Sequence, residues 1–267
     1  MKLNVLRADP AGNITLFVLD PIERESRAAL AAELMRRLPD MKIDQVGFAC
    51  PADADTDGRM EMMGGEFCGN ATMSLAALLA FQENLPDGGE AVYPLEVSGT
   101  DGIVPCRIRR SGDVCRGTVC MPLPEEIREV DFPDGVRCPV VFFPGIAHAI
   151  VREGVLRSSD APRCIPRWCE ACETDALGVI LADDALDRIR PLVYVRSTDS
   201  SVWERGCGSG TAALGAYLAH ERRGDAALDV AQPGGTIHVE AKWDGERVSR
   251  LEISGDVRLA ATGEAWI

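Results

Sequence analysis

The sequence predicts an α/β protein, of the α+β type, with two pseudo-symmetric domains that each wrap a curved mixed sheet around a central helix. Three observations lead to this prediction: strand and helix patterns alternate along 267 residues, a segment of the first half recurs in the second, and the helix after each copy is apolar nearly all round. A helix of that kind is buried on every side. We expect domains at residues 1–123 and 124–267, with the last strand able to cross back to the first domain.

The first half alternates between short apolar runs and turn residues. Residues 14–19 and 45–50 predict strands, and Asp20 is placed to cap a helix over residues 21–38. A glycine-marked turn at residues 64–69 leads into the apolar helix. Further strands are then expected at residues 92–97, 102–108 and 116–121, separated by turns at Gly99 and Gly112.

The second half repeats this order. Strands are expected at residues 140–143, 149–151, 177–181 and 192–195, with a turn at residues 145–148 and two or three more strands between residue 219 and Ile267. A loop that contains proline and tryptophan carries Cys164, Cys169 and Cys172. Their spacing is compatible with a contribution to a metal site, but no fourth ligand is evident, so we assign no metal.

The recurring segment is centred on a cysteine. C-G-N-A-T begins at Cys68 and C-G-S-G-T begins at Cys207, and each opens a helix rich in alanine and leucine. The two copies are half a chain apart, which indicates a duplication and predicts two similar domains with a cleft between them.

Each cysteine stands just before a helix, where backbone N–H groups and the helix dipole favour negative charge. We therefore expect a lowered thiol pKa and amides that can hold a substrate carboxylate. These amides belong to Gly69, Asn70, Gly208 and Ser209. A thiol on either side of an α-carbon could remove its proton from one face and deliver a proton to the other. A pyridoxal phosphate lysine is not evident among Lys2, Lys42 and Lys242, so we expect no cofactor.

The composition excludes several kinds of partner. A formal net charge of −14 and a pI near 4.7 disfavour nucleic acid and anionic membrane surfaces. No apolar run is long enough for a membrane helix, and no signal peptide is evident, so we expect a cytoplasmic protein whose ten cysteines are thiols. The expected partner is a small amino-acid substrate, and a homodimer is left open.

Five motifs resemble those of the diaminopimelate-epimerase-like isomerases along almost the full length. They are Gly12-Asn13, Glu66-Phe67-Cys68-Gly69-Asn70, Gly145-Ile146-Ala147-His148, Glu204-Arg205-Gly206 and Cys207-Gly208-Ser209-Gly210-Thr211. The resemblance implies the diaminopimelate-epimerase-like fold, with Cys68 and Cys207 as acid and base. It also implies substrate contacts from Asn13, Asn70, His148, Glu204 and Arg205.

Two departures bear on the substrate. Ile146 replaces an asparagine of the family's Gly-Asn-Pro-His turn, and Arg59 aligns with another asparagine that holds the distal carboxylate in diaminopimelate epimerases. The run Gln45-Val46-Gly47-Phe48 and the first cysteine motif resemble instead the histidine racemases of staphylopine-type metallophore biosynthesis, which adds Gln45 to the expected substrate contacts.

We therefore predict a cofactor-independent amino-acid racemase or epimerase with histidine as leading substrate. Diaminopimelate epimerase, a dehydratase of the proline-racemase type and a ligand-binding relic of the fold are the alternatives.

Overall fold

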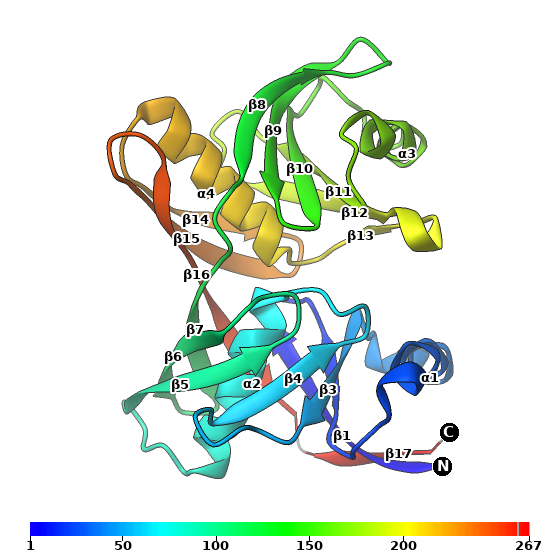
Figure 1. The fold of residues 1–267 in the computed structure, drawn as a ribbon, viewed down its shortest axis with the longest axis vertical. Coiled ribbons are helices and arrows are strands. Elements are labelled where there is room, and N and C mark those ends of the chain that lie inside the picture. The colour runs from blue at the N-terminus through cyan, green and yellow to red at the C-terminus, as the bar shows by residue number, and fades with distance from the viewer. Residues whose placement is uncertain (261, 267) are drawn as a thin grey trace. The chain divides into compact units, whose positions relative to one another are not determined.

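The computed structural model describes residues 1–260 and 262–266, and the chain divides into two compact units (Figure 1). Unit 1 comprises Met1–Cys120 and Ser254–Ile267, and unit 2 comprises Met121–Ile253. Strand β16 (Val248–Leu259) contributes residues to both units. The boundary expected from the sequence stood after residue 123.

Unit 1 consists mainly of strands. Its other elements, in chain order, are β1 (Lys2–Pro10), β2 (Thr15–Val18), α1 (Arg24–Arg37), a 3₁₀ turn (Pro39–Met41), β3 (Gln45–Cys50), β4 (Gly58–Met62), α2 (Gly69–Gln82), β5 (Glu90–Val97), β6 (Ile103–Ser111), β7 (Val114–Cys120) and β17 (Gly263–Trp266).

The sheet of unit 1 closes around α2. Its strand order runs from β16 through β7, β6, β5, β4, β3 and β2 to β1, and β1 pairs in turn with the last residues of β16. The pairs β2–β3 and β4–β5 are parallel and the remaining neighbours with a described register are antiparallel. Eleven of the fourteen residues of α2 are buried, and the helix contacts β1 and β4 to β7. The predicted wrapped mixed sheet and central helix are confirmed.

Helix α1 begins later than expected, and the predicted cap at Asp20 is wrong. The Asp20 carboxylate instead accepts hydrogen bonds from the main-chain N–H (2.5 Å) and side-chain Nδ2 (2.9 Å) of Asn4 on β1. The helix starts at Arg24 with Glu23 as its first flanking residue, and it buries Leu30 and Leu34 against the sheet.

Unit 2 has one six-stranded sheet, and its last strands form one end of the 11-stranded sheet whose other strands belong to unit 1. Its elements are β8 (Glu126–Asp131), β9 (Arg137–Phe143), β10 (Ile146–Arg152), α3 (Ala161–Ala171), β11 (Ala176–Ala182), β12 (Ile189–Val195), a 3₁₀ turn (Arg196–Thr198), β13 (Ser200–Trp203), α4 (Gly208–Arg222), β14 (Ala226–Gln232), β15 (Gly235–Trp243) and the first half of β16.

Helix α4 is the counterpart of α2 in unit 2. It contacts β14 and β15 of one sheet and β9 and β10 of the other, whose order is β13-β12-β11-β10-β9-β8. Helix α3 contacts β11 and β12 and forms a separate core. The second predicted central helix is therefore also confirmed, since most of α4 is buried.

The loop expected around the three cysteines is wrong, because most of it is helix α3. Its apolar side chains recur with helical spacing, so Cys164, Ile165, Trp168 and Cys169 lie on its buried side. Trp168 stacks on Phe132 at 4.0 Å between ring centroids. Within the described ranges, no helix has the length and apolar composition needed to cross a membrane.

Candidate active site

Cys68 is the N-cap residue of α2, in an extended conformation that turns the chain into the helix. Its Sγ accepts a hydrogen bond from the N–H of Ala71 (3.5 Å) and donates one to Oε1 of Gln45 (3.3 Å). The amide of Gln45 is itself held, because its Nε2 donates to Oγ1 of Thr15 (2.8 Å). Two neighbouring strands, β2 and β3, thereby orient the thiol at the helix end.

Cys207 occupies the same place at the start of α4. Its Sγ accepts a hydrogen bond from the N–H of Gly210 (3.3 Å) and lies 3.5 Å from Oγ of Ser209. Its main-chain N–H donates to Oε1 of Gln232 at 2.7 Å. The duplicated sequence has thus produced the same cap twice: an extended cysteine whose sulfur faces the amide three residues on.

Gln232 belongs to this site but was not among the residues expected from the sequence. Besides its bond to Cys207, its Nε2 donates to Oγ1 of Thr211 (2.8 Å), and that hydroxyl donates to the carbonyl of Cys207 (2.7 Å). It ends β14, and the turn residues that follow it, Pro233 and Gly234, were the signal that could have marked it.

The sulfur of Cys207 is buried beside a negative charge. The pKa of the Cys207 thiol lies well above its ordinary range, because the side chain is buried and because the carboxylate of Glu204 lies beside it and hydrogen-bonds with it. The contacts with Ser209 and Gly210 lower that pKa and are outweighed. For Cys207, the lowered pKa expected from the helix dipole is therefore wrong, since burial and a like charge dominate.

His148 lies inside β10, so the turn expected over residues 145–148 is confined to its beginning. Its imidazole is completely buried, and neither ring nitrogen has a hydrogen-bond partner among the described residues. Burial lowers its pKa to about 3, so the ring is neutral near physiological pH.

The place of His148 depends on a glycine in the next strand. Gly178 lies opposite it in the parallel pair β10–β11, and a Cβ there would stand 2.1 Å from Nδ1 of His148. Ile180, two residues on, points to the same face, and its Cδ1 would be 2.6 Å from a Cβ at Gly210. The imidazole is therefore on the sheet face that packs against the N-terminal turn of α4.

The other expected contact residues fall into the same two neighbourhoods. In unit 1, Asn13, Gly69 and Asn70 are buried, and the carbonyl of Ile14, next to Asn13, accepts from the N–H of Gln45. In unit 2, Gly208 is buried and Ser209 and Glu204 are partly exposed, whereas Arg205 is exposed and its carbonyl accepts from Gly234. The structure brings Gln45 to Cys68, and Glu204 and Ser209 to Cys207.

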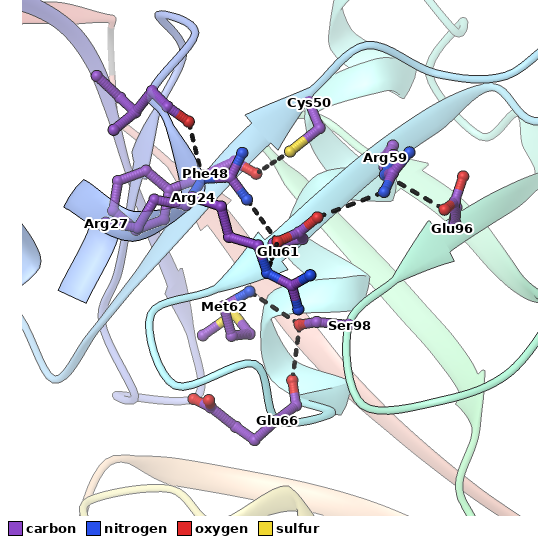
Figure 2. A network of polar contacts seen from close by, with 11 residues as sticks. Arg24, Arg27, Phe48, Cys50, Arg59, Glu61, Met62, Glu66, Glu96 and Ser98 are labelled. Carbon is purple, nitrogen blue, oxygen red and sulfur yellow. Dashed lines mark hydrogen bonds and ion pairs between the residues drawn. The ribbon is translucent and has the colours of Figure 1, made fainter.

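Arg59 lies in a network of charges on β4 (Figure 2). Its guanidinium pairs with Glu61 (3.4 Å) and with Glu96 (3.2 Å), while Arg27 also donates to Glu61. This network borders a cavity of about 510 Å³ in unit 1 that Cys68 does not line. Across residues 1–260 and 262–266, no group of three or more histidine, cysteine, aspartate or glutamate side chains is arranged to hold a metal.

The fold of this chain is shared by solved racemases and epimerases. A solved hydroxyproline epimerase from Agrobacterium vitis, with bound trans-4-OH-L-proline, has this fold: its TM-score is 0.68 over 99% of this chain and 92% of that one, at 13% identity.

The chain belongs to the histidine racemase family, because the family model for the histidine racemase CntK N-terminal domain matches residues 2–266. A histidine racemase of Staphylococcus aureus is 30% identical, covering 97% of this chain and 96% of its own length. One from Fusobacterium nucleatum is 29% identical, covering 99% and 97%.

Proposed function

We propose that this protein is a cofactor-independent amino-acid racemase that uses Cys68 and Cys207 as its two proton carriers, with histidine as its leading substrate. The observation that carries the proposal is the repeated N-cap geometry of the two thiols in a chain of the histidine racemase family. In each repeat, the sulfur stands among backbone amides that can also hold an anion.

In the proposed reaction, one thiolate takes the proton from the α-carbon and leaves the electron pair on the substrate. The opposite thiol then gives its proton to the other face of that carbon, which inverts it and exchanges the protonation states of the two sulfurs. The amides of Gly69, Asn70, Gly208 and Ser209 hold the carboxylate, whose charge grows as the carbanion forms. The mechanism requires each thiol to reach one face of the same carbon.

The remaining side chains orient the substrate or the thiols. A neutral His148 can accept a hydrogen bond from the substrate ammonium, and Glu204 can pair with the same group while it keeps Cys207 protonated. Gln45 orients the sulfur of Cys68, because its Oε1 accepts from that sulfur while its Nε2 donates to Thr15. Asn13, Asn70 and Arg205 are proposed to fix the substrate's position.

The charge network around Arg59 favours histidine over diaminopimelate. Glu61 and Glu96 already neutralise the guanidinium, so a distal carboxylate would have to displace them. With Ile146 in place of an amide, a second amino-acid head would be buried without partners, which is costly. A dehydratase of the proline-racemase type needs only one base, so the presence of both cysteines supports racemisation.

Incubation in D₂O with L-histidine or with diaminopimelate, followed by chiral chromatography and mass spectrometry, tests the proposal. We expect D-histidine with deuterium at the α-carbon, and turnover of diaminopimelate weaker by about tenfold or more, from one or two lost hydrogen bonds. Conversion of diaminopimelate without any of histidine would refute the substrate assignment. Exchange in neither compound nor in a panel of L-amino acids would refute the racemase.

Glu204→Gln is expected to move the alkylation profile of Cys207 to lower pH. The negative charge beside the thiol raises its pKa, so a neutral amide of the same size lets the thiolate form at lower pH. Peptide mass mapping of iodoacetamide labelling across a pH series measures the midpoint. The exposed Glu221, at the far end of α4, gives a matched control, Glu221→Gln. An unshifted midpoint in Glu204→Gln would show that burial alone sets the pKa.

A further inference from the structure

The turn that precedes Cys68 is hydrogen-bonded to the residue that follows strand β5. Residues 63–67 connect β4 to the cysteine, and Ser98 follows directly after β5, the parallel neighbour of β4. The main-chain N–H of Ser98 donates to the carbonyl of Met60 at 3.1 Å, which continues the strand pairing by one residue.

The hydroxyl of Ser98 bridges the two ends of that turn (Figure 2). It accepts a hydrogen bond from the N–H of Met62 at 2.9 Å, at the end of β4. It donates to the carbonyl of Glu66 at 2.8 Å, two residues before Cys68. A single side chain therefore holds both the start of the turn, at Met62, and its end, at Glu66.

Gly99 supports the same turn through close contact. It has φ +75°, and a Cβ there would stand 2.0 Å from the backbone nitrogen of Phe67 and 2.4 Å from the carbonyl carbon of Glu66. Only a residue without a side chain permits this approach. The backbone immediately before Cys68 thus rests on the backbone of Gly99.

We propose that Ser98 and Gly99 are positioning residues that set the orientation, and hence the reactivity, of the Cys68 thiol. Both act through the peptide that joins Glu66 to Phe67. This inference rests on the proposed function for its effect on turnover, but not for its effect on the thiol. A misplacement of about 1 Å in a reacting group can cost about 100-fold in rate.

Gly99→Ala tests the contact against a matched control in the same turn, Gly102→Ala. Both glycines have positive φ, but a Cβ at Gly102 would meet nothing within 4 Å. Both variants carry the same kind of backbone strain, so the difference between them reports the close contact at Gly99. We expect kcat to fall about tenfold or more in Gly99→Ala only, with a smaller change in KM. Equal kcat values in the two variants would overturn the proposal.

Ser98→Ala tests the bridge, and Ser98→Thr keeps the hydroxyl. The readout is the iodoacetamide labelling rate of Cys68 across a pH series, with Cys207 in the same sample as internal reference. We expect Ser98→Ala to alter the profile of Cys68 but not that of Cys207, and Ser98→Thr to restore it. An unchanged Cys68 profile in Ser98→Ala would refute the positioning role. An altered profile in a protein that racemises no amino acid would support that role and refute the proposed function.

Discussion

Replacement of Cys68 or Cys207 by alanine is expected to lower racemisation at least about 100-fold in both directions. Each face of the α-carbon needs its own proton carrier, and a positioned acid or base contributes that much or more. Chiral chromatography of histidine from each starting enantiomer measures the loss. A single alanine variant that keeps more than about a hundredth of the wild-type rate would contradict the two-thiol mechanism.

Stability has to be measured beside activity, because both sulfurs also cap helices. Alanine removes the sulfur that accepts the N-cap hydrogen bond, which lowers the free energy of unfolding by about 0.5–2 kcal/mol. Serine keeps an acceptor at the same place and retains part of that stability. Cys50→Ala is the matched control, since Cys50 is a half-buried thiol on β3 that caps no helix. It is expected to keep its turnover.

His148→Leu is expected to stabilise the protein and to remove most of its activity. A buried imidazole with two unpartnered nitrogens costs about 1–3 kcal/mol, which an apolar side chain of similar size recovers. Turnover should fall, because the proposed acceptor for the substrate ammonium is lost. Chemical denaturation and the histidine assay measure the two effects. A variant that is less stable, or as active as the wild type, would contradict this role.

The stability gain should grow as the pH falls. In the unfolded chain the imidazole binds a proton below its usual pKa of about 6.5, whereas in the folded protein it does so only near pH 3. Between these two pKa values, the free energy of unfolding of the wild type therefore falls by up to about 1.4 kcal/mol for each unit by which the pH is lowered. His148→Leu has no imidazole at this position and does not show this loss. His220→Leu, on the exposed end of α4, is the matched substitution at a histidine that is not buried.

The sequence was sufficient to predict the two central helices and the residues that cap them. Their apolar composition on every side leaves a buried position as the only stable one, and the repeat of Cys-Gly at each start marks the same local turn twice. The mixed sheets followed from the alternation of strand and helix signals. These features depend on residues close together in the chain.

Long-range contacts explain where the sequence-based interpretation was wrong or incomplete. Asp20 has the features of a helix cap, but its carboxylate accepts a hydrogen bond from Asn4 on β1 instead. Cys207 has the setting of a reactive thiol, but burial and Glu204 raise its pKa. The supporting role of Ser98 had no local signal, because its partner Glu66 is 32 residues away. Gln232 had only the turn residues after it as a signal, because its partner Cys207 is 25 residues away.

The discontinuity of unit 1 bears on the order in which the two units can be completed during synthesis. Unit 2 is a single uninterrupted segment, whereas β1 of unit 1 finds two of its partners, the end of β16 and β17, only after residue 253. A ribosome that has released residues 1–253 has supplied every strand of unit 2 but has left β1 with open hydrogen-bonding groups. The unit that begins first is therefore the unit whose sheet is completed last.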